Sequence, residues 1–456
     1  MSDHRPMLNR ITGLPNRHSL YTRRGGWKVA TGIDSRSIHF VLVRILGIDA
    51  ILDSFGTSTF EAALYLYSRA MQRVLGLDGE LFHLRDHDFL WVTPLQGRSL
   101  ALRLHKLERV VAASMSLKQI RIRCRSVMGV SAFPRDGRTV SKLLARADAA
   151  LRYAHKLGVV AKRYSLAITV QEAQRQDMVM DLARCLEGDS RYGHLEVHIQ
   201  PKARLTRYES GCFSLAVESG EVLLRWNHPL KGVIPNGMFI PLAEEVGLIE
   251  PLGKWVIFGL IRFLRRWRAV HSTFRYAVNV SARQLEGGEF RWLLEKLVAQ
   301  GDLDPKLIIL ELTETSRILV PQKVFENLAA LKELGFKISI DDYGAGFTSQ
   351  SEVKDFAFDE IKIDKSLVDD LRQNQKVLPI IRSLSRLGDD LHIPIVAEGV
   401  EEYWQLVELW KAGIRVVQGY ILSKPMGVEE FFHRYSNRKP LKIFPRVVNQ
   451  DRKSVV

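Results

Sequence analysis

The chain has 456 residues, of which 46% are hydrophobic and 26% charged, with a formal net charge of +15. This length suits two or three domains with cores of their own. No apolar stretch approaches the roughly 18 residues of a membrane span, and the polar start Met1–Arg10 lacks the apolar core of a signal peptide, so we expect a cytoplasmic protein with no membrane span. Cys124, Cys185 and Cys212 lie far apart without metal-ligand spacing and are expected to be reduced thiols.

The positive charge is unevenly spread along the chain. Residues 1–165 hold 27 Lys and Arg against 12 Asp and Glu, whereas the remainder holds 39 of each class. The front part therefore presents either a solvated basic surface or a docking site for a polyanion or a protein partner. No aromatic–basic nucleic-acid motif supports the polyanion. The segment 438–456 is a second basic stretch, which we expect to be a poorly ordered tail.

Residues 5–165 are predicted to form a separate α/β domain. The expected elements, in chain order, are a strand at Phe40–Ile45, a helix at Glu61–Leu75, a hairpin at Leu81–Thr93 turning at Asp86–Asp88, a strand at Arg121–Phe133 and a helix at Ser141–Leu157. Gly158 follows the last helix as a normal C-cap. Apolar residues at helical spacing over 166–185 predict a helical linker to the next domain.

Two motifs of this front segment resemble the GGDEF (diguanylate cyclase) domain, and the resemblance implies a nucleotide-cyclase-like fold. Ile11–Arg17 is similar to the family's entry motif, and Ala145–Leu151 is similar to its closing helix. The position of the five-residue signature is held instead by Arg85, Asp86, His87, Asp88 and Phe89.

This site departs from the family pattern where chemistry is needed. The signature glycines, which let a nucleotide approach the backbone closely, are replaced by Arg85 and Asp86. A metal-holding carboxylate of the family corresponds to Arg44, and a guanidinium cannot ligate Mg²⁺. We therefore predict a degenerate GGDEF domain that is not a cyclase and serves as a regulatory or dimerisation module. Asp86 and Asp88 are expected to be solvated turn carboxylates.

The rest of the chain alternates short apolar runs with helical stretches. The eight runs are Leu195–Gln200, Glu221–Trp226, Tyr276–Asn279, Leu307–Glu311, Lys337–Asp342, Glu360–Lys362, Pro394–Glu398 and Val416–Gln418. The intervening helices are expected at Leu252–Val270, Phe290–Gln300, Pro321–Leu334, Val377–Leu391 and Trp404–Ala412. Eight such repeats predict a (β/α)8 barrel, in which catalytic side chains project from the carboxyl ends of the strands.

One end of this barrel would collect many oxygen ligands, namely Glu221, Asn279, Glu311, Asp341, Asp342 and Glu398. Carboxylates crowded together raise one another's pKa values unless cations neutralise them. Hard ions such as Mg²⁺ or Mn²⁺ prefer oxygen ligands, and two of them about 3.5–4 Å apart support phosphodiester hydrolysis. No histidine stands among these positions, which makes zinc a poorer fit. Lys362 is a candidate to hold the attacking water or to neutralise phosphate charge.

These runs resemble, in order, the motifs of the EAL family of cyclic-di-GMP phosphodiesterases over residues 186–437. The matching segments are Glu221–Trp226, Asn279–Ser281, Glu311–Glu314, Asp341–Gly344, Lys362–Asp364, Ala397–Glu401 and Gln418–Tyr420. The resemblance implies hydrolysis of c-di-GMP to 5'-pGpG, with catalytic roles for Glu221, Asp342, Lys362 and Glu398. It also implies substrate binding by Gln200, Arg225, Asp364 and Gln418, a loop anchor at Glu314 and a homodimer through this domain.

The loop Tyr343–Gln350 keeps both family glycines but carries Ala345 and Gln350 at altered positions, which puts the turnover rate and the dimer contacts in question. Leu205–Ser219 also differs from the family's short hairpin turn. Two alternatives stay open: a non-catalytic c-di-GMP receptor, and a regulator that binds a partner or RNA through the basic front half.

Overall fold

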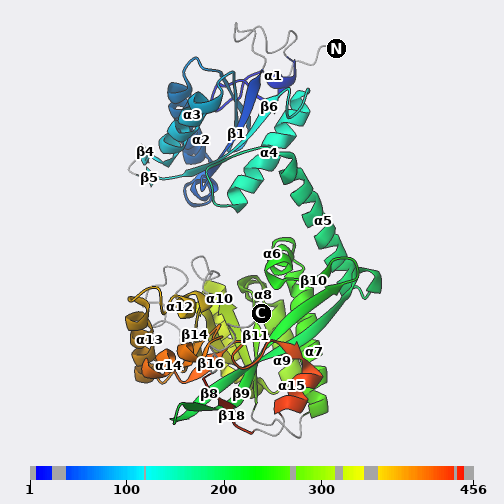
Figure 1. Cartoon of the computed structure of the whole chain (residues 1–456). Helices are drawn as coiled ribbons and strands as arrows, with labels where there is room; N and C mark the ends of the chain where they lie inside the picture. The colour runs from blue at the N-terminus through cyan, green and yellow to red at the C-terminus, as the bar shows by residue number, and fades with distance from the viewer. Residues whose placement is uncertain are drawn as a thin grey trace, which may run out of the picture. The chain divides into compact units, whose positions relative to one another are not determined.

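The computed structural model describes residues 7–22, 37–117, 120–267, 274–313, 322–343, 358–435 and 439–445. The chain divides into two compact units, Met1–Arg175 and Gln176–Val456 (Figure 1). Helix α5 (Leu166–Leu186) contains this division. Among the described residues, no helix is long and apolar enough to cross a bilayer.

The front unit is a five-stranded sheet in the order β2-β3-β1-β6-β7, in which β7 is parallel to β6 and the other pairs are antiparallel. Its strands are β1 (Ile38–Leu46), β2 (Glu80–Arg85), β3 (Asp88–Thr93), β6 (Arg125–Phe133) and β7 (Ala161–Arg163), and β4 (Met115–Leu117) and β5 (Ile120–Ile122) form a separate hairpin. Its helices are α1 (Arg17–Thr22), α2 (Asp49–Leu75), α3 (Gly97–Ala112) and α4 (Val140–Lys156).

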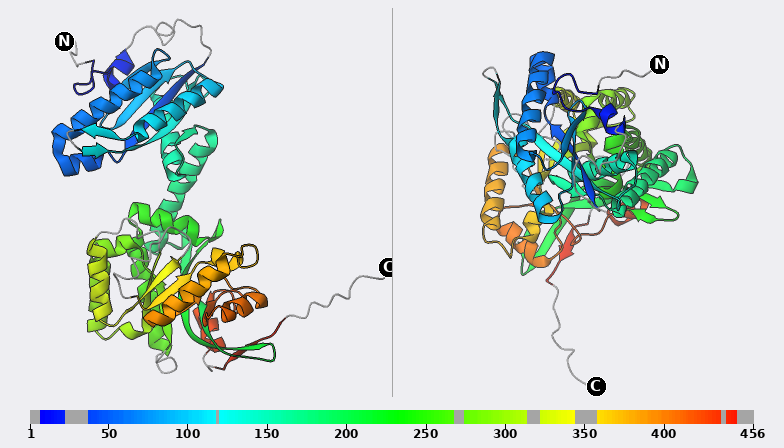
Figure 2. Two further views of the ribbon diagram at one scale, coloured as in Figure 1. Left: turned by 90° about the vertical axis from the view of Figure 1, so that its left-hand side faces the viewer. Right: turned by 90° about the horizontal axis from the view of Figure 1, so that it is seen from above.

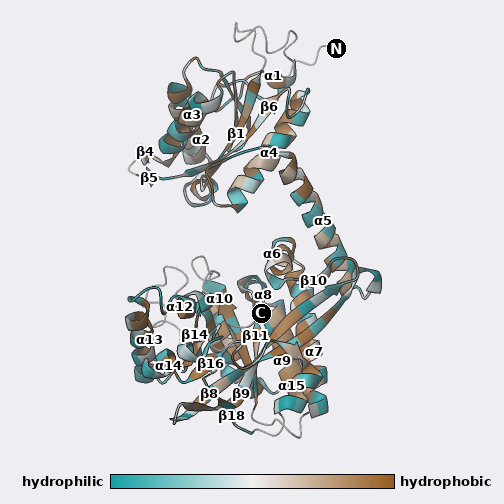
Figure 3. Ribbon diagram, in the orientation of Figure 1, coloured by the Kyte–Doolittle hydropathy of each residue, from teal (hydrophilic) through white to brown (hydrophobic). Residues whose placement is uncertain are grey.

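Strand β1 is buried on both faces because helices cover each side of the sheet. Val41 and Val43 share a core cluster with residues of α2 and α3, whereas Leu42 packs with Ala147 and Leu151 of α4. This arrangement follows from the period of two along a strand. The helices that cover the sheet carry hydrophobic and hydrophilic residues along their length, as Figure 3 shows for α4.

Three expectations for the front unit need correction. The strand expected at Arg121–Phe133 is two strands, β5 and β6. Helix α2 begins at Asp49 rather than near Glu61 and is kinked at Gly56, whose positive φ of 77° interrupts the regular helix. Helix α3 was not expected, although Leu100, Leu104, Leu107 and Val111 recur at helical spacing along one face.

The back unit is the predicted (β/α)8 barrel, which is confirmed. Eight strands close on themselves in the order β8-β9-β11-β12-β13-β14-β15-β16, and β8 pairs with both β9 and β16. They are β8 (His194–Glu209), β9 (Cys212–His228), β11 (Arg275–Asn279), β12 (Ile308–Thr313), β13 (Lys337–Tyr343), β14 (Glu360–Ile363), β15 (Ile395–Ala397) and β16 (Val416–Gln418).

Within the described part of the chain, helices follow most of the barrel strands from β9 onward and surround the barrel (Figure 2). They are α6 (Asn236–Val246), α7 (Ile249–Trp267), α8 (Ala282–Glu286), α9 (Glu289–Ala299), α10 (Gln322–Glu333), α12 (Lys365–Asp369), α13 (Val377–Leu391), α14 (Tyr403–Lys411) and α15 (Val428–Tyr435). The short strands β10 (Gly232–Ile234) and β17 (Met426–Gly427) add to the edges of β9 and β8.

One barrel strand does not run as expected. β8 is antiparallel to both of its neighbours, so the end of the run Leu195–Gln200 is not a carboxyl strand end at the barrel mouth. Gln200 instead lies inside β8, directly opposite Glu221 of β9. The hairpin with the next strand β9 and the pairing with the distant β16 set this direction, and the spacing of apolar residues within the run does not report it.

The segment Leu205–Ser219 extends the β8–β9 hairpin beyond the barrel. Ser210 and Gly211 form its tight turn with positive φ angles of 48° and 75°, as two-residue hairpin turns require. Strand β18 (Leu441–Ile443) pairs with this extension through Phe213–Leu215. The expectation of a poorly ordered tail is therefore wrong for Leu441–Ile443, because β9 offers it an open edge.

Candidate functional site

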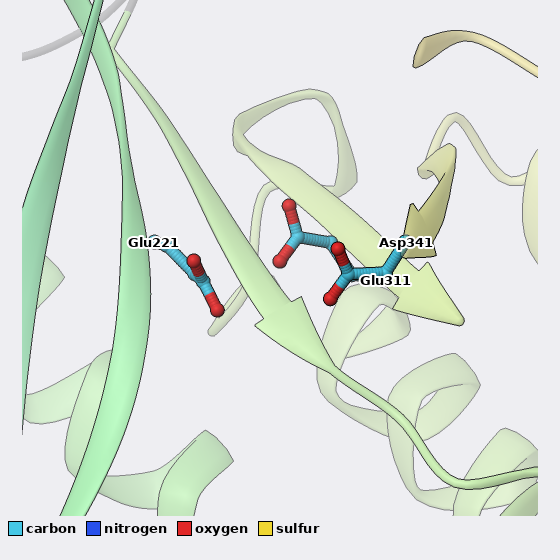
Figure 4. A group of neighbouring side chains, drawn as sticks. All are labelled: Glu221, Glu311 and Asp341. Carbon is cyan, nitrogen blue, oxygen red and sulfur yellow. The ribbon is translucent and has the colours of Figure 1, made fainter. Parts of the chain in front are cut away.

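The barrel mouth gathers most of the predicted ligands. Neighbouring strands place Asn279 of β11 beside Glu311 of β12, and Thr313 of β12 beside Asp341 of β13. Figure 4 shows the side chains of Glu221, Glu311 and Asp341 gathered across three strands. Parallel strands in register bring their carboxyl ends to one edge, which is why residues spread over most of the unit meet here.

Lys362 of β14 lies at the centre of this group and is 1% exposed at its side chain. Its Nζ atom is 2.6 Å from Glu398, 2.9 Å from Asp341, 3.1 Å from Glu311 and 3.6 Å from Glu221. One ammonium thus faces four carboxylates in a site largely closed to water. Such a group is held together only if further positive charge or protons balance the carboxylates.

The pKa values of the carboxylates follow from this imbalance. Burial raises the pKa of Glu398 to about 8, against the opposing attraction of Lys362. Burial likewise raises the pKa of Glu311 to about 7 and that of Asp342 to about 6. Burial also raises the pKa of Glu221, but the ammonium groups of Lys362 and Lys202 outweigh burial, so the pKa of Glu221 lies below its usual value. Burial opposes the charge of Lys362, yet the surrounding carboxylates raise its pKa well above the usual value.

These carboxylates form two groups suited to metal ions. Glu221, Glu311 and Asp341 place one oxygen each within 4.8 Å of one another, and so do Asp341, Asp342 and Glu398. The two groups share Asp341, as ligands of two neighbouring ions do in two-metal sites. When all are ionised, these five carboxylates together with Glu360 outnumber the two buried ammonium groups of Lys362 and Lys202 by four charges, which two divalent cations would neutralise. The residues therefore fit a pair of oxygen-loving divalent ions.

Two predicted substrate-binding glutamines lie beside Glu221. Gln418 Nε2 donates to Glu221 Oε2 at 2.6 Å and to Gln200 Oε1 at 3.2 Å, and both glutamines are buried. Asn279 Nδ2 donates to the other oxygen of Glu221 at 2.8 Å. These bonds fix the orientation of the Glu221 carboxylate.

The other two predicted substrate residues have different surroundings. Arg225 is half-buried, and burial lowers the pKa of its guanidinium. Asp364 caps helix α12, because its Oδ1 accepts a hydrogen bond from the backbone N–H of Ser366 at 2.9 Å. Glu314 and the altered positions Ala345 and Gln350 lie outside the described residues.

Sequence reasoning missed two residues of this region. Asn236, at the start of α6, lines a cavity of about 550 Å³ that also reaches Asn279 and Asp342. Its Oδ1 has no hydrogen-bond partner among the described residues. Lys202 lies below the mouth, fully buried against Glu311. Its position two residues after Gln200 on a strand was a signal that both side chains share one face.

The front unit carries a different arrangement at the degenerate signature. Asp88 is 4% exposed, and Arg44 donates to both its oxygens, at 2.7 and 2.9 Å. Burial raises the pKa of Asp88, but Arg44 outweighs it and holds the pKa below the usual value. The expectation of a solvated Asp88 is therefore wrong, because a facing strand supplies a bidentate partner. Asp86 is exposed in the turn with a positive φ of 39°.

Comparison with known proteins assigns both units. Residues 191–425 match the model of the EAL domain, and residues 7–159 match that of the diguanylate cyclase GGDEF domain. An uncharacterised signalling protein of Caulobacter vibrioides is 33% identical over 425 residues, which cover 92% of this chain and 51% of that protein. MucR of Pseudomonas aeruginosa, described as a bifunctional diguanylate cyclase/cyclic di-GMP phosphodiesterase, is 29% identical over 92% of this chain and 60% of its own.

The solved structure of the phosphodiesterase PaMucR in complex with c-di-GMP resembles the back unit. It is 33% identical, covers 56% of this chain and 99% of that chain, and superposes with a TM-score of 0.50. The present chain spans only about half to three fifths of the length of these curated relatives. The chain is a tandem GGDEF–EAL protein and belongs to the EAL domain family.

Proposed function

We propose that the back unit is a metal-dependent phosphodiesterase that opens c-di-GMP to linear 5'-pGpG. The observation that carries the proposal is the pair of carboxylate groups joined at Asp341 around Lys362. The family and the c-di-GMP complex of a structure with 33% identity support the same substrate. Two ions, Mg²⁺ or Mn²⁺, would be held by Glu221, Asn279, Glu311, Asp341, Asp342 and Glu398.

The proposed reaction breaks one P–O3' bond by attack of water at phosphorus and leaves a 3'-hydroxyl and a 5'-phosphate. When bound, two divalent ions supply stabilisation of the attacking and leaving oxygens. Lys362 Nζ donates a hydrogen bond to the attacking water and offsets charge on the phosphoryl oxygens. Arg225 can bind a phosphate through two parallel N–H groups. Gln418 orients Glu221 and donates to Gln200, and both glutamines are proposed to contact the substrate.

The cavity beside the site suits one base of the substrate. It is lined by apolar residues such as Ile240 and Val256, and it borders the candidate ligands Asn279 and Asp342. A half-buried amide oxygen without a partner costs free energy until something donates to it. We propose that Asn236 Oδ1 accepts a hydrogen bond from a guanine N–H.

The front unit is proposed to be degenerate as a cyclase. Arg44 occupies the strand position that would hold a metal ion and pairs with Asp88 of the signature segment. A carboxylate engaged on both oxygens by a guanidinium has little left to offer a cation. MucR, described as bifunctional, is a relative, so this proposal rests on the residues of this chain alone. We propose a regulatory or dimerisation role for the unit, with a homodimer forming through the EAL domain.

Purified protein incubated with Mn²⁺ and c-di-GMP tests the phosphodiesterase, with products separated by chromatography. Formation of 5'-pGpG that stops when EDTA is added supports it. Tight binding of c-di-GMP without product would favour a receptor instead. Incubation with GTP tests the front unit, and appearance of c-di-GMP would show that its degeneracy was wrongly inferred. Light scattering with and without c-di-GMP tests the homodimer.

A further inference from the structure

A charged layer lies beneath the candidate site, inside the barrel. The interior of a (β/α)8 barrel is normally filled by bulky branched side chains. Here Lys202 of β8 is 0% exposed, and its Nζ lies 2.6 Å from Glu311 Oε1 and 2.9 Å from Glu360 Oε1. Ser339 Oγ donates to the same oxygen of Glu360 at 3.2 Å. Burying such an ion cluster costs free energy, so its presence calls for a reason other than stability.

The strand explains why Lys202 points inward. Ile199 and Ala203 belong to the main hydrophobic core, whereas Gln200 and Lys202 alternate with them on the face that contacts the site. Because β8 is antiparallel to its neighbours, the residue after Gln200 on that face lies deeper in the barrel rather than nearer its mouth. Lys202 thus reaches Glu311 from below.

The two oxygens of Glu311 have different partners. Oε1 receives the hydrogen bond of Lys202, and Oε2 receives that of Lys362 at 3.1 Å. Lys362 also contacts Asp341 and Glu398, so the Oε2 side is the one that faces the other candidate ligands. With one oxygen held from below, the carboxylate keeps a single orientation.

We propose that Lys202 is a positioning residue, which holds Glu311 through Oε1 so that its remaining oxygen lone pairs are directed at a divalent ion. This inference rests on the proposed metal site. Partners that orient a ligating carboxylate typically change metal affinity 10- to 100-fold when removed. Among the described contacts, Lys202 pairs with Glu311 and with no other candidate ligand. Its charge also acts on Glu221, which belongs to the same ion group as Glu311.

The effect is confined to one of the two ions. Glu311 belongs to the group with Glu221 and Asp341 but not to the group of Asp341, Asp342 and Glu398. Loss of Lys202 is therefore expected to weaken one Mn²⁺ site about 10- to 100-fold and to leave the other near its original affinity. Removing the positive charge of Lys202 would by itself strengthen Mn²⁺ binding nearby. A fall in Mn²⁺ affinity in the variant would therefore show that the Glu311 carboxylate has lost its orientation.

The experiment titrates Mn²⁺ into the metal-free full chain by calorimetry, without substrate. Lys202→Met is compared with the double variant Lys202→Met/Glu360→Met, which replaces the lower ion pair by apolar side chains, a change that is often neutral or stabilising. Glu360→Gln is the matched control, because it keeps the contact between Lys202 and Glu311. Melting temperatures recorded beside each titration show which variants fold.

We expect both variants that lack Lys202 to show one weakened site, and Glu360→Gln to bind both ions within about threefold of wild type. Wild-type binding in the folded double variant would overturn the inference. So would its failure to fold, since Lys202 would then serve the barrel rather than the ligand. A wild-type chain that binds no Mn²⁺ overturns the metal site and this inference together. One that binds two ions without hydrolysing c-di-GMP overturns only the proposed reaction.

Discussion

Glu398→Gln is expected to stabilise the metal-free back unit while it removes a candidate metal ligand. Glu398 lies against Lys362, yet burial together with Asp341 and Glu221 raises its pKa to about 8 from an ordinary 4.5. In the unfolded chain the same carboxylate ionises near its ordinary value. The folded state therefore binds more protons than the unfolded state between about pH 4.5 and pH 8, and its stability falls as the pH rises through that window.

The size of the effect follows from the two pKa values. Each pH unit inside the window costs on the order of 1.4 kcal/mol, so Glu398 costs about 3 kcal/mol at pH 7 and on the order of 5 kcal/mol above pH 8. A glutamine imitates the protonated acid and carries no such cost at any pH. For a domain of this size, 1 kcal/mol moves the melting temperature by roughly 2–4 °C. The variant should therefore melt roughly 6–12 °C higher at pH 7.

The assay is thermal unfolding of wild type and variant in EDTA, from pH 5 to pH 9. The two curves are expected to converge near pH 5 and to separate as the pH rises. Excess Mn²⁺ should reverse the order, because only the wild type keeps all its ligands. If the variant is no more stable than wild type at pH 8.5 without metal, the attraction of Lys362 already offsets the cost of burying the charge of Glu398. In that case the raised pKa of Glu398 is refuted.

Three further variants test other contacts. Glu221→Ala should lower kcat by at least about 100-fold, since it removes a candidate metal ligand itself. Glu218→Ala changes an exposed residue of the same strand and should leave kcat near the wild-type value. If Glu221→Ala keeps more than a tenth of wild-type activity, the result counts against the site. Arg225→Met should raise KM about 10- to 100-fold with little change in kcat, because a charged hydrogen bond to the bound phosphate is lost. An unchanged KM would show that Arg225 lies outside the substrate site. Arg44→Ala should cost the front unit about 3 kcal/mol in urea unfolding, because the buried Asp88 loses its bidentate partner. Arg85→Ala removes only a longer contact of 3.4 Å to Asp88 from an exposed side chain and should cost about 1 kcal/mol or less. Equal losses in the two variants would contradict the dominant role of Arg44.

Much of the barrel could be predicted from local pattern alone. All eight apolar runs became strands, and helix α13 begins and ends at the expected residues, Val377 and Leu391. Whether a strand or one face of a helix is buried can be predicted from the spacing of apolar residues that stand only a few positions apart. The ligands could be predicted for the same reason, since Glu311 and Asp341 each stand near the end of an apolar run.

What the sequence by itself determined is the set of strands, their number and the acidic residues placed at or near their ends. What only the tertiary structure decided is which partners those residues meet. Lys202 meets Glu311 across 109 positions and Glu360 across 158, and Arg44 meets Asp88 across 44. The antiparallel course of β8, which carries Lys202 beneath the site, is set by its hairpin with the neighbouring β9 and by its pairing with the distant β16. The spacing of apolar residues reports whether a residue is buried or exposed. Which partner a buried charge meets depends instead on how segments far apart in the sequence pack together.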